Sequence, residues 1–110
     1  MKLPADTTIV KDKLTRYLLL LQARGDKSAF LARAGYTLEN ADQLLRDLRM
    51  QILPLEVVAL ESNQFGQYYE SRGTLTGPNG VMLAVRAIWI TEHLSGVTKF
   101  VTLVPDKRST

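Results

Sequence analysis

The chain has 110 residues, 45% of them apolar, no cysteine, and a formal net charge of +3. This length suits one domain with a core of its own, and the lack of cysteine excludes disulfides and thiolate metal sites. The longest apolar run, residues 17–21, is too short to span a membrane, and residues 1–6 lack the start of a secretory signal. We therefore expect residues 1–110 to form a single cytoplasmic domain without membrane association.

The first half of the chain has the periodicity of amphipathic helices, which we predict over about residues 9–21, 27–34 and 37–52. The third has the clearest apolar stripe: Leu38, Ala41, Leu44, Leu45, Leu48 and Ile52. The residues expected at helix ends are Asp6 or Thr8, Asp26 and Thr37 as N-caps, and Gly25 and Gly35 as stops. Pro54 marks the end of the helical part, about 9–52.

The second half has the alternation and turn residues of β-structure. We predict strands over residues 56–62, 67–76, 81–91 and 97–104, joined by turns at 63–66, 77–80 and 92–96. The sheet then covers about residues 55–105, followed by a short frayed tail, 106–110. The predicted fold is α+β, with three N-terminal helices packed on one face of a four-stranded antiparallel meander.

The predicted third strand is apolar on both of its faces. One face carries Val81, Leu83, Val85, Ala87 and Trp89, and the other carries Met82, Ala84, Arg86, Ile88 and Ile90. Only one of these faces can lie under the helices. The other needs sheet curvature, a subunit partner or a bound ligand to shield it from water, and we expect a homodimer or another protein partner there.

No motif in the sequence specifies a reaction, a metal or a cofactor. His93, the only histidine, is expected in an exposed turn, with a lone general base as the alternative. The carboxylates of the β half, Glu56, Glu61, Glu70 and Glu92, are expected to be solvated or salt-bridged to Arg72 and Arg86. Trp89 is expected in the core.

One combination of residues keeps nucleic-acid chemistry open. Residues 1–53 hold nine Lys or Arg against six acids, whereas residues 54–110 are balanced at five of each. Lys27, Arg72, Arg86 and Thr102 are the candidate site residues, because a small metal-independent ribonuclease uses cations and proton-transfer groups on a phosphorane. Tyr68, Tyr69 and Trp89 offer stacking surfaces for bases. The competing interpretation is core packing, surface salt bridges and weak, non-specific RNA binding.

A series of short motifs in chain order resembles a family of small bacterial domains of unknown function. The series consists of Lys13-Leu14 with Tyr17-Leu18-Leu19, the stretch 25–30 with Gly35-Tyr36, Phe65-Gly66 with Tyr68, the stretch 77–80, Trp89, and Phe100-Val101-Thr102 with Pro105. The family pattern is K-L-x-x-Y-L-L, G-x-K-A-x-F-F, F-G-x-x-Y, G-P-x-G, W and L-V-T-x-Y-P. Ser28, Leu31 and Val104 depart from it.

The resemblance implies a domain that occurs alone or at the ends of larger toxin-like proteins. It singles out Lys27 and Thr102 as the polar pattern positions, with Arg72 and Arg86 as supporting cations. Two functions follow as expectations. The first is a protein-binding or assembly module, such as one half of a two-gene system. The second is a toxin-like metal-independent ribonuclease or RNA-binding domain. Nothing specific favours a small-molecule enzyme.

Overall fold

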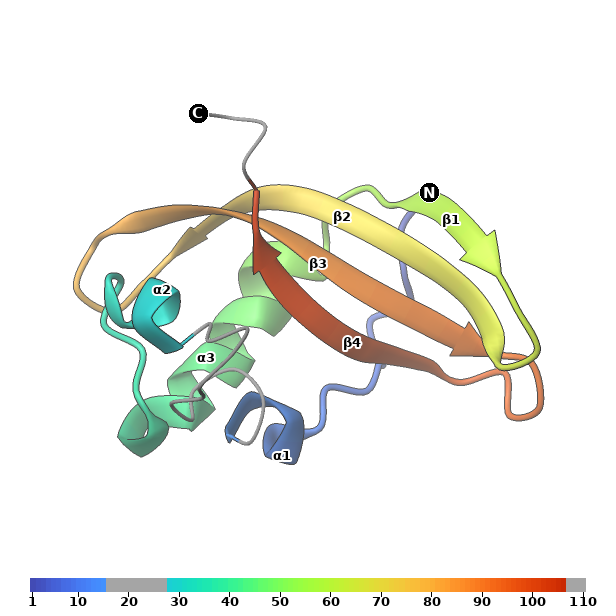
Figure 1. Ribbon diagram of the computed structural model, residues 1–110, viewed down its shortest axis with the longest axis horizontal. Helices are drawn as coiled ribbons and strands as arrows, with labels where there is room; N and C mark the ends of the chain where they lie inside the picture. Colours follow the sequence, from blue (N-terminus) through green and yellow to red (C-terminus); the bar gives the residue numbers. More distant parts are fainter. Residues whose placement is uncertain (16–27, 107–110) are drawn as a thin grey trace.

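The computed structural model describes residues 1–15 and 28–106. Its sheet consists of β1 (Val58–Ser62), β2 (Gly66–Thr76), β3 (Met82–Glu92) and β4 (Thr98–Pro105), antiparallel and in the order β1-β2-β3-β4. Each strand pairs with the next one along the chain, as predicted. The long strands arch over the helices, which cover one face of the sheet (Figure 1).

The helices are shorter and less regular than predicted. They are α1 (Lys11–Lys13), α2 (Ser28–Ala32) and α3 (Ala41–Asp47); the 3-10 turn η2 (Leu38–Asn40) precedes α3, and the π-helical turn η3 (Leu48–Ile52) follows it. The helix predicted at 37–52 is therefore present, but as three consecutive segments of 3-10, α and π geometry. Of the described helices only α3 reaches seven residues, so three full helices packed on one face are only partly confirmed.

The start of the first predicted helix is wrong for a specific reason. Thr8 is bound into the sheet, since its N–H donates to Thr98 O (2.9 Å) and its carbonyl accepts from Phe100 N–H (2.8 Å). A backbone held in this way cannot begin a helix, and α1 starts three residues later with Val10 as N-cap. The rest of that predicted helix, with Gly25, Asp26 and the start of the second at residue 27, lies outside the described residues.

The N-terminal segment joins the two edges of the sheet. Lys2 forms an antiparallel bridge with Glu56, next to β1, and Thr8 forms a parallel bridge with Lys99 on β4. Each bridge is an isolated backbone pair and not a strand, so the sequence has no alternating pattern that would predict it.

Among the described residues, no helix is long and apolar enough to cross a membrane.

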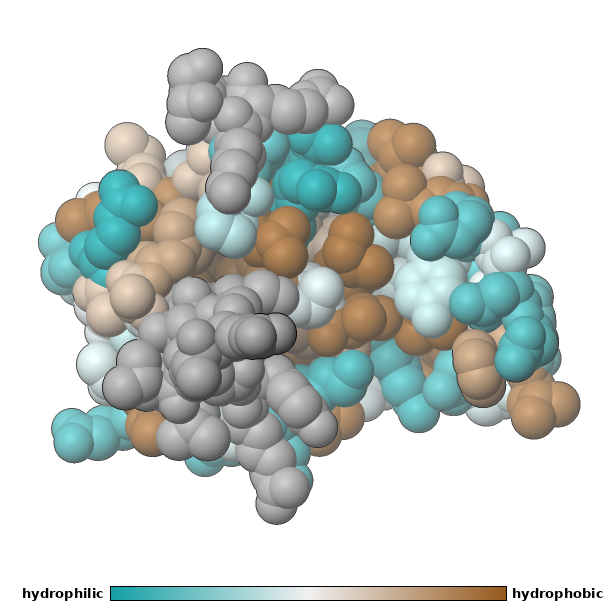
Figure 2. All heavy atoms as spheres, viewed as in Figure 1, coloured by the Kyte–Doolittle hydropathy of each residue, from teal (hydrophilic) through white to brown (hydrophobic). Residues whose placement is uncertain are grey.

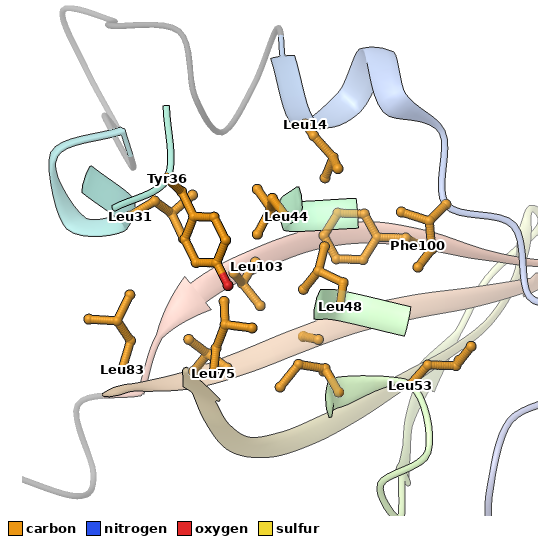
Figure 3. Close-up of a cluster of buried hydrophobic side chains, with 14 of the residues drawn as sticks. Leu14, Leu31, Tyr36, Leu44, Leu48, Leu53, Leu75, Leu83, Phe100 and Leu103 are labelled. Atoms are coloured by element: carbon orange, nitrogen blue, oxygen red, sulfur yellow. The ribbon is translucent and has the colours of Figure 1, made fainter. Parts of the chain in front are cut away.

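The core fills the space between the helices and the inner face of the sheet (Figure 3). Leu44 and Leu48 point at the sheet from α3 and η3, and Leu75 and Leu103 face them from β2 and β4; Leu83 on β3 belongs to the same cluster. Trp89 is fully buried beneath this layer, edge-on to Phe100, and donates from Nε1 to Ser71 Oγ at 3.1 Å. The core position predicted for Trp89 is confirmed.

Candidate functional site

The face of the sheet that points away from the helices is called the outer face below. Because Trp89 and Phe100 pair across β3 and β4 and are buried in the core, the alternate residues belong to the outer face. Its strand residues are Val58, Gly66, Tyr68, Glu70, Arg72, Thr74, Thr76, Met82, Ala84, Arg86, Ile88, Ile90, Glu92, Lys99, Thr102 and Val104. The division of β3 into two apolar rows is therefore confirmed, and the row beginning with Met82 is the one turned outward.

An ion-paired cluster occupies the middle of the outer face. Arg72 Nε donates to Glu70 Oε1, and Arg86 Nη2 donates to Glu70 Oε2 at 2.7 Å. Arg72 Nη1 also lies 3.2 Å from Asp106 Oδ1, just past the end of β4. The two guanidinium groups and two carboxylates sum to zero charge, so the cluster has no net attraction for an anion.

Glu70 is buried although it lies on the outer face, with a relative exposure of 8%. Its neighbours along the row are Val58 on β1, Ile88 on β3 and, one strand further, Thr102 on β4. The hydrogen bond from Arg86 lowers the pKa of Glu70 below its ordinary value; burial opposes this, and the bond from Arg72 adds to it. Arg86 Nε is buried and has no hydrogen-bond partner among the described residues.

The surroundings of the ion-paired cluster are apolar. Val58 and Met82 are exposed, at 67% and 70%, and Ile88, Ile90 and Val104 are half-buried. The outer face thus combines a neutralised polar centre with exposed and half-buried apolar side chains around it.

The structure brings together three of the four candidate residues predicted from the sequence. Arg72 and Arg86 are direct partners across β2 and β3, and Thr102 lies in the neighbouring row, opposite Ile88. Lys27 lies outside the described residues. The expected salt bridges to Arg72 and Arg86 are present for Glu70, whereas Asp106 was missed because it was placed in a frayed tail. Its N–H in fact donates to Ala84 O at 2.9 Å.

His93 is exposed in the turn after β3, as expected. Its N–H donates to Phe65 O (3.1 Å) and its Nε2 lies 3.0 Å from Asn63 O, so it ties together the two turns at one end of the sheet. Phe65 and Leu94 are exposed in these turns, and apolar surface is visible among the polar side chains at this end of the sheet (Figure 2). Seven residues of β-strand, about 23 Å, separate His93 from Arg86. His93 therefore belongs to no acid–base pair with the cluster.

Several cations of the helical half bind groups of the chain itself. Lys11 Nζ lies 2.9 Å from Asp42 Oδ1, and Arg49 donates to the carbonyls of Ala5 (3.1 Å) and Thr7 (3.0 Å). Part of the basic excess of residues 1–53 is therefore already bound to carboxylate and carbonyl groups of the chain. Within residues 1–15 and 28–106, no group of three or more metal-ligating side chains is close enough to hold an ion.

A family model described as "Domain of unknown function (DUF6883)" matches residues 2–107. No curated protein and no solved structure matches the chain.

Proposed function

The chain belongs to this family of domains of unknown function, and we propose that it is an assembly module whose outer face binds a second copy of the chain. The observation that carries the proposal is Glu70, a carboxylate buried to 8% exposure and doubly ion-paired at the centre of the sheet face that the described helices leave open. Because the charge of Glu70 is already neutralised within its own chain, a second copy that covers it leaves no unpaired buried charge.

The charge pattern favours a second copy as the occupant. In a two-fold dimer the same surface contacts itself, so an unpaired charge near the axis lies opposite a charge of the same sign and is repelled by it. The ion-paired cluster has no net charge, and Lys99, at the edge of the face, is paired with Glu92 at 3.3 Å. A copy of the chain can therefore pack over Glu70 without opposing like charges.

The area of the outer face is compatible with a weak dimer. At about 3.3 Å per residue and about 4.8 Å between strands, the four strands cover a flat area of about 550 Å². Two such faces contribute about 1,100 Å², close to the lower limit of about 1,200 Å² for specific interfaces. We therefore expect a weak dimer that dissociates on dilution.

Sedimentation equilibrium over a dilution series tests this function, with Val58→Lys as the disrupting variant. Val58 is the exposed apolar residue in the row of Glu70, so a lysine there adds an unpaired charge to the interface and leaves the core untouched. The matched control is Met50→Lys, which places the same charge at an equally exposed apolar position on η3.

The expected result is a wild-type dimer that dissociates on dilution, a monomeric Val58→Lys variant and a Met50→Lys variant that behaves as wild type. A wild-type chain that stays monomeric at millimolar concentration would exclude self-assembly. A dimer unaffected by Val58→Lys would place the interface elsewhere.

The toxin-like ribonuclease or RNA-binding function was expected from the family resemblance and the basic first half of the chain, and the adjacent Arg72 and Arg86 are a further feature in its favour. Their ion pairs with Glu70 and Asp106 compete with phosphate, which makes this the weaker candidate. A gel-shift series with total RNA at increasing salt, followed by a check for cleavage, tests it. Salt-sensitive binding or cleavage lost in Lys27→Ala would support the ribonuclease, and intact unbound RNA at low salt would exclude it.

A further inference from the structure

A second feature, separate from the outer face, is a cavity between the N-terminal segment and η3. It has a volume of about 480 Å³ and is lined by Lys2, Leu3, Ala5, Arg49, Leu53 and Pro54. We propose that this cavity binds a small amphipathic anion: one compact apolar body that carries a single negatively charged group.

The cavity is held open by bonds between its two walls. Arg49, on η3, donates through Nη1 and Nη2 to the carbonyls of Ala5 and Thr7 in the N-terminal segment. The other end of that segment is fixed by Val57 N–H, which donates to Met1 O at 2.8 Å. The two walls are thus cross-linked at both ends, and a ligand finds a site that is largely formed before it binds.

The backbone of the second wall is unusual. Leu53 N–H donates to Leu48 O at 2.8 Å, five residues back, which closes the π-helical turn η3. Such turns are rare and occur frequently at functional sites. Here the turn is followed directly by Leu53 and Pro54, which line the cavity together with Arg49.

The lining specifies the chemistry of the ligand. Leu3 and Leu53 are buried and, with Ala5 and Pro54, offer an apolar surface. Lys2 and Arg49 supply two cations, and a guanidinium has five N–H donors, of which the carbonyls of Ala5 and Thr7 use two. Glu56, whose pKa the nearby N-terminal amine and Lys2 lower, is an acid next to the site. The N-terminal amine, Lys2 and Arg49 together exceed this one carboxylate by two positive charges.

The size of the cavity limits the ligand to a small molecule. Ligand pockets of about 300–1,000 Å³ take single organic molecules and present mostly apolar walls with a few polar groups. The cavity lies within this range and has that composition. An inorganic ion would leave the apolar wall uncovered, and an uncharged hydrocarbon would make no ion pair with Lys2 or Arg49.

Two fluorescent probes with the same kind of aromatic body test the proposal. Anilinonaphthalene sulfonate carries one negative charge, and N-phenyl-1-naphthylamine is neutral. We expect saturable binding of the sulfonate, about two- to fivefold tighter than the neutral probe, as one ion pair in partial contact with water gives. Decanoate should displace the sulfonate more effectively than decanol at the same concentration, and inorganic phosphate should not displace it.

Two variants locate the binding. Lys2→Met keeps an apolar side chain and should weaken the sulfonate by about two- to fivefold without changing the neutral probe. Ala5→Trp fills the cavity from an exposed position and should weaken both probes by at least about tenfold. The control is Lys11→Met, which removes a cation on α1 that is paired with Asp42 and should change neither affinity.

Circular dichroism and thermal unfolding of each variant establish that it is folded. Equal affinities for the charged and neutral probes in the wild-type chain would overturn the assignment of an anion. Unchanged binding in a folded Ala5→Trp variant would overturn the assignment of the cavity, whatever the outcome of the dimer experiment.

Discussion

Arg72 and Arg86 lie directly opposite each other on β2 and β3, and one carboxylate, that of Glu70, binds both. Like charges at directly opposite positions destabilise a sheet unless a counter-charge lies between them. Glu70 therefore stabilises the outer face by separating the two positive charges. The two arginines in turn neutralise its carboxylate, which allows it to be buried.

The first prediction is that Glu70→Gln destabilises the chain strongly. The change leaves two guanidinium groups side by side with no shared carboxylate. Removal of one partner from a fully buried ion pair costs about 3–5 kcal/mol, and we expect about 2–3 kcal/mol because both arginines keep part of their surface in water. Urea unfolding at neutral pH measures this loss.

The control is Glu61→Gln, which removes an exposed carboxylate from β1 and should change the free energy of unfolding by less than about 0.5 kcal/mol. Equal effects of the two variants would show that the ion-paired cluster contributes nothing specific.

The second prediction concerns the pH dependence of the same cluster. The bond from Arg86 lowers the pKa of Glu70 below 4.5, its ordinary value, so the folded state favours the ionised carboxylate. The resulting stability is fully present above pH 4.5 and is lost as the pH falls through the lowered folded-state value. Urea unfolding from neutral to acidic pH should show the gap between wild type and Glu70→Gln closing in that window. A gap that stays constant would contradict the linkage.

The sheet was predictable from the sequence because its signals are local. The Gly77-Pro78-Asn79-Gly80 turn and the alternation along β2 each involve residues that are neighbours in the chain. The helical layer was less predictable, since apolar spacing indicates a helix but does not distinguish α, 3-10 and π pitches. For 37–52 the prediction gave the extent and missed the pitch.

The candidate sites depend on contacts between residues that are distant in the chain. Arg72 and Arg86 were recognised as candidates, but their meeting at Glu70 follows from the strand register, which composition does not give. Asp106 reaches Arg72 only because β4 ends beside Ala84. The cavity at Arg49 arises from an N-terminal segment that crosses to β4 without any strand pattern. These long-range contacts form through the tertiary fold.

The third prediction is that Tyr36→Phe costs about 1–3 kcal/mol, the range for a buried hydrogen-bonding group left without its partner. Tyr36 Oη lies 2.5 Å from Asp47 Oδ2 and 3.2 Å from Thr76 O, and the side chain is buried. Burial and the neighbouring Asp47 raise the pKa of Tyr36 above its ordinary range, so the hydroxyl stays a donor. The variant keeps the ring and removes only the O–H.

The comparison for this variant is Tyr68→Phe, in a half-buried tyrosine on the outer face. No hydrogen bond among the described residues involves the Tyr68 hydroxyl, and its loss should change the free energy of unfolding by less than about 0.5 kcal/mol. Urea unfolding of both variants measures the two changes in the free energy of unfolding. A Tyr36→Phe variant as stable as wild type would mean that Asp47 finds another donor.

The fourth prediction separates two reasons for glycine within one hairpin. At Gly77 an added Cβ would lie 2.0 Å from Ala34 O, a backbone atom that cannot give way. At Gly80 the space is open, but φ is +87°, which side chains rarely adopt. We expect Gly80→Ala to cost about 1 kcal/mol, from backbone strain alone. Gly77→Ala should cost about 3 kcal/mol, at the upper end of overpacking, because α2 and the hairpin must move apart.

Gly80→Asn is the diagnostic third variant, since asparagine tolerates positive φ better than alanine and should recover part of the loss. No such rescue is expected at residue 77, where any side chain meets Ala34. Thermal unfolding of the three variants ranks them, with Gly77→Ala the least stable. If Gly80→Ala proved the more damaging change, the hairpin would be limited by its turn conformation, and its close contact with Ala34 would be unimportant.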